Sequence, residues 1–247
     1  IDNCLFADNS WDSSVACYPY ASGGGLSAIL SRLVIRNCVV ENNTTDISGG
    51  GIRLNDVFSD DFESMLRMEN TRVVNNSAIG EECSGGGMSS YLLNSEGPEA
   101  VITDCVFADN TATAGAGGIG LYGKRPVRMS RCSIDNNSTG VFGGGASFMT
   151  LWTATECEFT NNQATDRSGA FFSYFSGGKS LMTNCLVSNN QSKEDIIFLA
   201  DNLSSHTVIA NCTVVDNVTE NADSSALYVE NDSYGLTDIR NTIIWGN

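Results

Sequence analysis

The side chains of this sequence that could perform catalysis are few, and they form no recognisable catalytic arrangement. The one histidine, His206, lies in the Ser-rich stretch 202–206, which we interpret as a solvated loop. Glycosidases place two carboxylates on either side of the bond they cleave. The best acidic cluster here is Asp60 and Asp61 with Glu63, in a long insertion between repeats. We interpret that cluster as a solvated surface and expect no enzymatic activity.

A second set of oxygen-bearing side chains raises the question of metal binding. Aspartate or asparagine occupies one recurring position along the chain, and oxygen-rich side chains are the ligands of Ca²⁺. The same residue types also cap turns through their own backbone. We favour turn capping and expect no cofactor, with Ca²⁺ binding as the alternative. The position is filled by Asp8, Asn42, Asn75, Asp109, Asn136, Asn161, Asn189 and Asp216.

The chain has nine cysteines, an odd number, so at least one lacks a partner within the chain. Two of them, Cys17 and Cys83, lie in corresponding loops two repeats apart. We predict that they form a disulfide between these loops, which implies an oxidising compartment. The other seven recur at a single position of a repeat: Cys4, Cys38, Cys105, Cys132, Cys157, Cys185 and Cys212.

The elements that must position these residues are repeats of 25 to 34 residues, each marked by the recurring cysteine or by Thr71 or Thr242 in its place. Two residues after this anchor the side chain is always apolar, as in Phe6 and Val40. Five residues after it, the residue is asparagine in all nine repeats. The nine are Asn9, Asn43, Asn76, Asn110, Asn137, Asn162, Asn190, Asn217 and Asn247.

The alternation of apolar and polar residues around each anchor predicts a short strand with one buried face. A Gly-rich step such as Gly49–Gly51 follows most anchors and leads into a second apolar segment. Variable spacing with a fixed internal register predicts an all-β solenoid, a parallel β-helix of about nine rungs. Stacking would align the asparagines into one ladder and the cysteines into another. We expect residues 1–247 to be a single segment of a longer β-helix.

Two motifs resemble those of a known group of proteins. Phe6-Ala7-Asp8-Asn9 and Phe107-Ala108-Asp109-Asn110 are similar to an FxxN motif, and Gly169-Ala170-Phe171 is similar to a GGA-apolar motif. Together they resemble the repeats of polymorphic outer-membrane proteins and other surface proteins of the pectin-lyase-like superfamily. The resemblance implies a right-handed single-stranded parallel β-helix that is extracellular or on the cell surface. The same superfamily includes polysaccharide lyases and hydrolases, so that activity is an alternative function.

The charge of the chain argues against two classes of partner. The formal net charge is −16, with 13 lysines and arginines. Binding to nucleic acid or to an anionic membrane needs a basic surface. Apolar runs such as Ile196–Ala200 are too short to cross a bilayer. We therefore expect neither a nucleic-acid partner nor direct membrane insertion.

Asn-x-Ser/Thr sequences recur in the chain, because asparagine and hydroxyl residues are common at the corners of the repeat. The ladder asparagines should point inward and stay unmodified. The outward ones could carry glycans in a eukaryotic secretory pathway. The candidates for glycosylation are Asn42, Asn75, Asn136, Asn202 and Asn231.

These features favour a structural, non-catalytic extracellular rod, such as a stalk, a sheath or a filament subunit that could also be adhesive. Its partners would be adjoining β-helix segments, or like subunits end to end, and cell-surface or matrix glycans. The alternative is a carbohydrate-binding module that uses exposed aromatic residues. The candidates for such contacts are Trp11, Tyr18, Tyr20, Trp152 and the aromatic run Phe171–Phe175.

Overall fold

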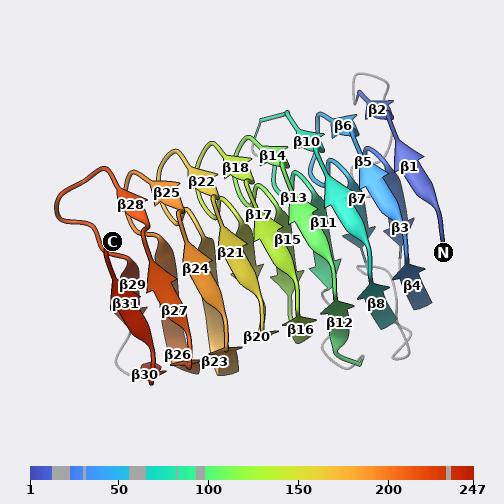
Figure 1. Ribbon diagram of the computed structural model, residues 1–247. Coiled ribbons are helices and arrows are strands. Elements are labelled where there is room, and N and C mark those ends of the chain that lie inside the picture. Colours follow the sequence, from blue (N-terminus) through green and yellow to red (C-terminus); the bar gives the residue numbers. More distant parts are fainter. Residues whose placement is uncertain (13–22, 30–31, 56–64, 82, 93–97, 232–234) are drawn as a thin grey trace.

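The computed structural model describes residues 1–12, 23–29, 32–55, 65–81, 83–92, 98–231 and 235–247. These residues form coils that stack side by side, with the first strands at one end of the stack and the last strands at the other (Figure 1). All strand pairs in the described ranges are parallel, and each strand pairs with its equivalent in the next coil, as Leu5 does with Val39. The fold is a parallel β-helix, as the repeat predicts. No helix occurs in these ranges, so none there could span a membrane.

One face of the coil is the anchor sheet, which has nine strands in the described part of the chain. Each of its strands has three residues and starts directly after the recurring cysteine or threonine. The nine strands correspond to the nine predicted repeats. They are β1 (Leu5–Ala7), β5 (Val39–Glu41), β9 (Arg72–Val74), β13 (Val106–Ala108), β17 (Ser133–Asp135), β21 (Glu158–Thr160), β24 (Leu186–Ser188), β27 (Thr213–Val215) and β31 (Ile243–Trp245).

The second face is the short sheet, whose eight described strands have two residues each and follow the recurring corner asparagine of the repeat. Outward positions carry small polar side chains such as Ser77 and Thr111, while inward positions such as Ala78 are buried. The strands are β2 (Ser10–Trp11), β6 (Thr44–Thr45), β10 (Ser77–Ala78), β14 (Thr111–Ala112), β18 (Ser138–Thr139), β22 (Gln163–Ala164), β25 (Gln191–Ser192) and β28 (Val218–Thr219).

The third face is the wide sheet, which has fourteen strands in the described residues. In most coils it contains two strands separated by a loop, and in two coils these merge into long strands, β23 (Phe171–Thr183) and β26 (Ile197–Ala210). The first strands are β3 (Leu26–Ile29), β7 (Ile52–Asn55), β11 (Met88–Leu92), β15 (Ile119–Gly123), β19 (Ala146–Met149) and β29 (Leu227–Asn231). The second strands are β4 (Arg32–Arg36), β8 (Met65–Glu69), β12 (Ala100–Thr103), β16 (Val127–Ser130), β20 (Trp152–Thr155) and β30 (Leu236–Arg240).

The core is a set of apolar columns that run along the axis of the stack. Val40, Val73 and Phe107 form part of one column on the anchor sheet, and all three are fully buried. Ile35 and Met68 begin another on the wide sheet. Because each side chain lies against its equivalent in the next coil, the columns bury surface that a single coil would expose.

The nine corner asparagines lie in one column inside the coil. Each side-chain amide donates to the side-chain oxygen of the asparagine in the next coil, at 3.0 Å from Asn110 to Asn137. The same oxygen accepts the backbone N–H of Asn110, at 3.1 Å. The amide of Asn137 also donates to the carbonyl oxygen of Phe107, at 2.8 Å. Each buried amide group is therefore satisfied by hydrogen bonds to its neighbours in the column and to carbonyl oxygens of the anchor strands.

The Gly-rich step is explained by the close approach of neighbouring coils. A Cβ atom on Gly117 would lie 2.4 Å from the carbonyl oxygen of Gly144 in the next coil. A Cβ atom on Gly118 would lie 2.9 Å from the side-chain amide of Asn137. Both distances are shorter than van der Waals contact. Glycine therefore lets the corner approach the asparagine column closely in the coils that carry the Gly-rich step, whereas the buried residues Ala170 and Ile196 take the place of Gly118 in later coils.

Two corners flank each anchor strand, and both use left-handed backbone conformations. The corner after the strand has the Asp/Asn position, for example Asp109 at φ 57° and Asn161 at φ 56°. The corner before the strand has the residue that precedes the cysteine, such as Asn184 at φ 56°. Asparagine and aspartate tolerate this conformation better than other side chains do. The predicted Asp/Asn column thus occupies the turns, and its residues set the backbone direction there.

Candidate functional site

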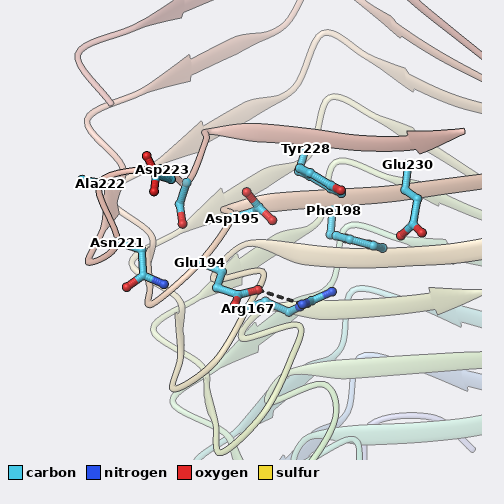
Figure 2. A pocket seen from close by; sticks show the side chains of 10 residues that line it. Arg167, Glu194, Asp195, Phe198, Asn221, Ala222, Asp223, Tyr228 and Glu230 are labelled. Carbon is cyan, nitrogen blue, oxygen red and sulfur yellow. Dashed lines mark hydrogen bonds and ion pairs between the residues drawn. The ribbon is translucent and has the colours of Figure 1, made fainter.

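A cleft of about 570 Å³ opens on the outer surface near the last coils of the described chain. Two corner segments border it, one at Glu194 and Asp195 and the other at residues 221–224 (Figure 2). Its floor is the outward face of β26 and β29, which present Phe198 and Tyr228. The cleft therefore lies where two successive corners rise above the wide sheet.

The floor of the cleft is the end of a row of aromatic rings that crosses four coils. The rings of Phe172 and Phe198 are 5.0 Å apart and almost parallel, at 9°. The ring centres of Phe198 and Tyr228 are 5.3 Å apart, with an angle of 17° between the ring planes. At the other end of the row, the ring centre of Phe142 is 4.8 Å from that of Phe172. Stacked rings cover one another's faces, so the inner rings offer a ligand only their edges. Tyr228, which is 43% exposed, is the ring of this row with an accessible face.

The charges of the cleft are predominantly negative. The Arg167 guanidinium donates to the Glu194 carboxylate at 2.8 Å and lies over the Phe198 ring, 5.1 Å from its centre. The Asp195 carboxylate accepts the backbone N–H of Ser225 at 3.2 Å and thus fixes the next corner. With Asp223 and Glu230, the lining holds four carboxylates and one guanidinium.

The structure corrects part of the prediction about exposed aromatic residues. Trp152 is only 2% exposed and its indole N–H donates to the Ser173 hydroxyl at 2.9 Å. Phe171 is also in the core, because in β23 it points inward while Phe172 and Tyr174 point outward. Trp11 is half-buried in the short sheet. Tyr18 and Tyr20 lie outside the described residues.

The candidates for catalysis and metal binding do not come together in the described residues. His206 lies within strand β26 and is half-buried, so its assignment to a loop is wrong. The loop is missing because the two strands of the wide sheet merge in that coil. Asp60, Asp61 and Glu63 lie outside the described residues. Within the described part of the chain, no three His, Cys, Asp or Glu side chains converge as metal ligands would.

The recurring cysteines lie in one column, and their thiols have a structural role. Each thiol donates to the carbonyl oxygen two residues earlier, at 3.2 Å from Cys105 to Thr103. Thr71, which takes the same place in its coil, makes the same bond to Glu69 at 2.9 Å. This bond closes the left-handed corner before the anchor strand, and it explains why threonine and cysteine interchange there.

Cys83 lies outside this column, as the spacing predicts. It is buried beside Ala78 and Ala112, and its thiol donates to the carbonyl oxygen of Asp46 at 3.2 Å. Burial raises the pKa of the Cys83 thiol. Its predicted disulfide partner, Cys17, lies outside the described residues, so the disulfide stays a prediction.

Three of the candidate glycosylation sites are exposed at outward corners, namely Asn42, Asn75 and Asn136. Asn202 and Asn231 belong to β26 and β29, and their side chains lie outside the described part of the structure. Asn211, in the sequence Asn211-Cys212-Thr213, is also exposed, at the corner before the anchor, and was not among the predicted glycosylation sites. Cys212 points inward, and neighbouring residues of the repeat alternate between inward and outward positions. That alternation could have identified Asn211 as an outward residue from the sequence.

Comparison with known proteins identifies the fold and no specific relative. Residues 83–192 match the family model described as a right handed beta helix region. No curated protein and no solved structure gives a significant match to the chain.

Proposed function

Taking the right-handed parallel β-helix as the premise, we propose that this chain is a structural, non-catalytic rod of an extracellular or cell-surface assembly. The observation that carries the proposal is the asparagine column. It links all nine coils through side-chain hydrogen bonds, from Asn9 to Asn43 at 2.8 Å through to Asn217 and Asn247 at 2.7 Å. The thiol and aromatic columns run in the same direction. Such a stack resists bending because each coil is bonded to both neighbours.

The test of this proposal has two parts. The purified chain is incubated with neutral, amino-sugar and uronate polysaccharides, and new reducing or unsaturated ends are measured. We expect no turnover. Turnover that is lost in Glu194→Gln or Asp223→Asn would overturn the non-catalytic assignment. In the second part, immunogold labelling of intact cells of the source organism should decorate surface structures. Labelling confined to the cell interior would overturn the location.

A second function, carbohydrate binding, is supported by the cleft shown in Figure 2. The exposed face of Tyr228 offers a stacking surface for a sugar ring, and Asp223 and Glu230 offer hydrogen-bond acceptors at its edge. Because carboxylates outnumber the single guanidinium, an acidic polysaccharide would be repelled. The ligand that fits this cleft is a neutral glycan or one that contains protonated amino sugars.

Isothermal titration with matched oligosaccharides tests the second function. Oligomers of glucose, glucosamine and galacturonate are compared on the wild type, on Tyr228→Ala and on Tyr174→Ala. Tyr174 is the control because it is 52% exposed on the same sheet and does not line the cleft. We expect Tyr228→Ala to weaken binding at least tenfold, about 1.4 kcal/mol, and Tyr174→Ala to leave it unchanged. Equal effects of the two variants, or tightest binding of galacturonate, would contradict the idea.

A further inference from the structure

The thiol column has a stretch in which five successive coils all carry cysteine. The residues are Cys105, Cys132, Cys157, Cys185 and Cys212, and all five are buried. The strands that follow them pair in register, so each cysteine of the stretch lies next to its equivalent in the neighbouring coil. The backbone N–H of Cys157 also donates to the sulfur of Cys185, at 3.4 Å. The interior of the coil thus contains a continuous line of sulfur atoms.

A groove of about 470 Å³ lies over this line at one place, on the outside of the corners before the anchor sheet. Cys157 and Cys185 are both part of its lining. On either side of Cys157 are the exposed carboxylates of Glu156 and Glu158. In the next coil the equivalent positions are Asn184 and Leu186, so the negative charge is local to this groove.

The chemistry of this arrangement is that of a soft-metal site. Thiolates are the ligands that select Cu(I) and related thiophilic cations. Metal–thiolate bonds are about 2.3 Å long, so an ion in line between two sulfurs needs them about 4.6 Å apart. Equivalent residues of neighbouring strands are about 4.8 Å apart. The spacing of two stacked cysteines therefore matches the distance between the two sulfur ligands of a linear ion. Such an ion needs only two ligands, and the described residues contain no group of three or more metal-binding side chains.

We propose that Cys157 and Cys185 bind one monovalent soft-metal ion, of the Cu(I) and Ag(I) class, in linear coordination. Glu156 and Glu158 attract the cation to the groove above the two thiols. Binding releases two protons: one M⁺ and two thiols give one bis-thiolate complex of charge −1 and two H⁺. No electron is transferred, and no other reactant is needed.

Threonine variants provide the test, because Thr71 and Thr242 already occupy this column and keep the bond to the corner carbonyl. Ag⁺ is added to the reduced chain in chloride-free buffer, and the bound ions are counted by native mass spectrometry. We expect Cys157→Thr and Cys185→Thr each to retain one Ag⁺ fewer than the wild type. The matched control is Cys105→Thr, which changes a thiol of the same column away from the groove and should retain as many ions as the wild type.

A second measurement does not depend on the variants folding. The wild type, with and without one equivalent of Ag⁺, is alkylated under mild denaturation and mapped by peptide mass spectrometry. Protection should appear first at Cys157 and Cys185. Equal ion counts in all three variants, a loss in Cys105→Thr as large as in the other two, or protection spread evenly over all cysteines would overturn the proposal.

Discussion

At the scale of single residues, the corner asparagine explains both the regularity of the repeat and its tolerance of variable loops. Asn137 shares hydrogen bonds with the side chains before and after it in the column and with the carbonyl of Phe107. Other side chains of similar size lack an amide that donates and accepts at once. This is why the position stays asparagine while the loops differ in length.

Replacement of one corner asparagine should therefore lower the free energy of unfolding by more than the loss of side-chain volume alone would. We expect Asn137→Ala to lower the free energy of unfolding by at least ~2 kcal/mol, because each buried group left without a partner costs ~1–3 kcal/mol. Chemical denaturation monitored by circular dichroism measures the change. Gln163→Ala, an exposed change on the short sheet, is the control and should stay within ~0.5 kcal/mol. Similar losses in both variants would contradict this role of the column.

The ion pair of Asp104 and Arg131 gives a prediction about pH. The guanidinium donates to both carboxylate oxygens, at 2.7 and 2.8 Å, and these bonds lower the pKa of Asp104. A lowered folded-state pKa contributes stability above the unfolded pKa of about 3.9, and this is lost as the pH falls through the folded pKa. The melting temperature of Asp104→Asn should thus be below that of the wild type at pH 7. The difference in melting temperature between the variant and the wild type should decrease as the pH falls below about 4.

The choice of asparagine for this variant matters, because Asp104 has a left-handed backbone at φ 54° that asparagine also tolerates. The variant thus removes the charge and keeps the corner. A difference in melting temperature that is constant from pH 7 to pH 3 would show that the ion pair is not its cause.

At the scale of the element, the corner before each anchor strand depends on a hydrogen-bond donor. In one of these corners the donor is the Cys132 thiol, which donates to the carbonyl oxygen of Ser130 at 3.4 Å. We expect Cys132→Thr to be within ~0.5 kcal/mol of the wild type, and Cys132→Val, which has a similar shape and no donor, to lose ~1–2 kcal/mol. Urea titration of the two variants makes the comparison. If valine proves as stable as threonine, packing alone determines this position.

The sequence predicts most of the architecture because its signals lie inside a fixed frame. The anchor, the apolar residue two positions on and the asparagine five positions on keep their spacing in every repeat, and the structure aligns them. The left-handed residue before the anchor is harder to recognise from the sequence, because Arg131 and Glu156 occupy this position where most repeats have asparagine or aspartate. There the corner is imposed by its neighbours and not by the intrinsic preference of the residue.

The candidate cleft could not be predicted in the same way. Its aromatic row joins Phe142, from a corner, to Phe172 and Phe198, from strands, so no single position of the repeat contains it. Which member of Phe171 and Phe172 faces outward depends on the register of β23, and a shift of one residue reverses it. The aromatic residues predicted to be exposed therefore include Phe171 and Trp152, which are buried.

At the scale of the whole molecule, each coil contacts only its neighbours, so coils should be removable as units. Deletion of residues 133–157 joins Cys132 to Glu158 and removes one complete repeat of 25 residues. We expect the shortened chain to keep its β-sheet circular dichroism and a cooperative thermal transition. Deletion of residues 133–145, about half a coil, should abolish both, because every later strand would lose its register. Equal behaviour of the two deletions would contradict the modular stack.

The asparagine column has a direction as well as a length. In every bond between two ladder side chains the earlier asparagine donates and the next one accepts, from Asn43 to Asn76 and onward to Asn190 and Asn217. The amides also donate to backbone carbonyls of the previous coil, but no side-chain oxygen of the column accepts from the asparagine after it. Small dipoles that point the same way add together, as the peptide dipoles of a helix do. The rod consequently carries a permanent electric moment along its axis, and a field applied to a dilute solution should orient the molecules and make that solution birefringent.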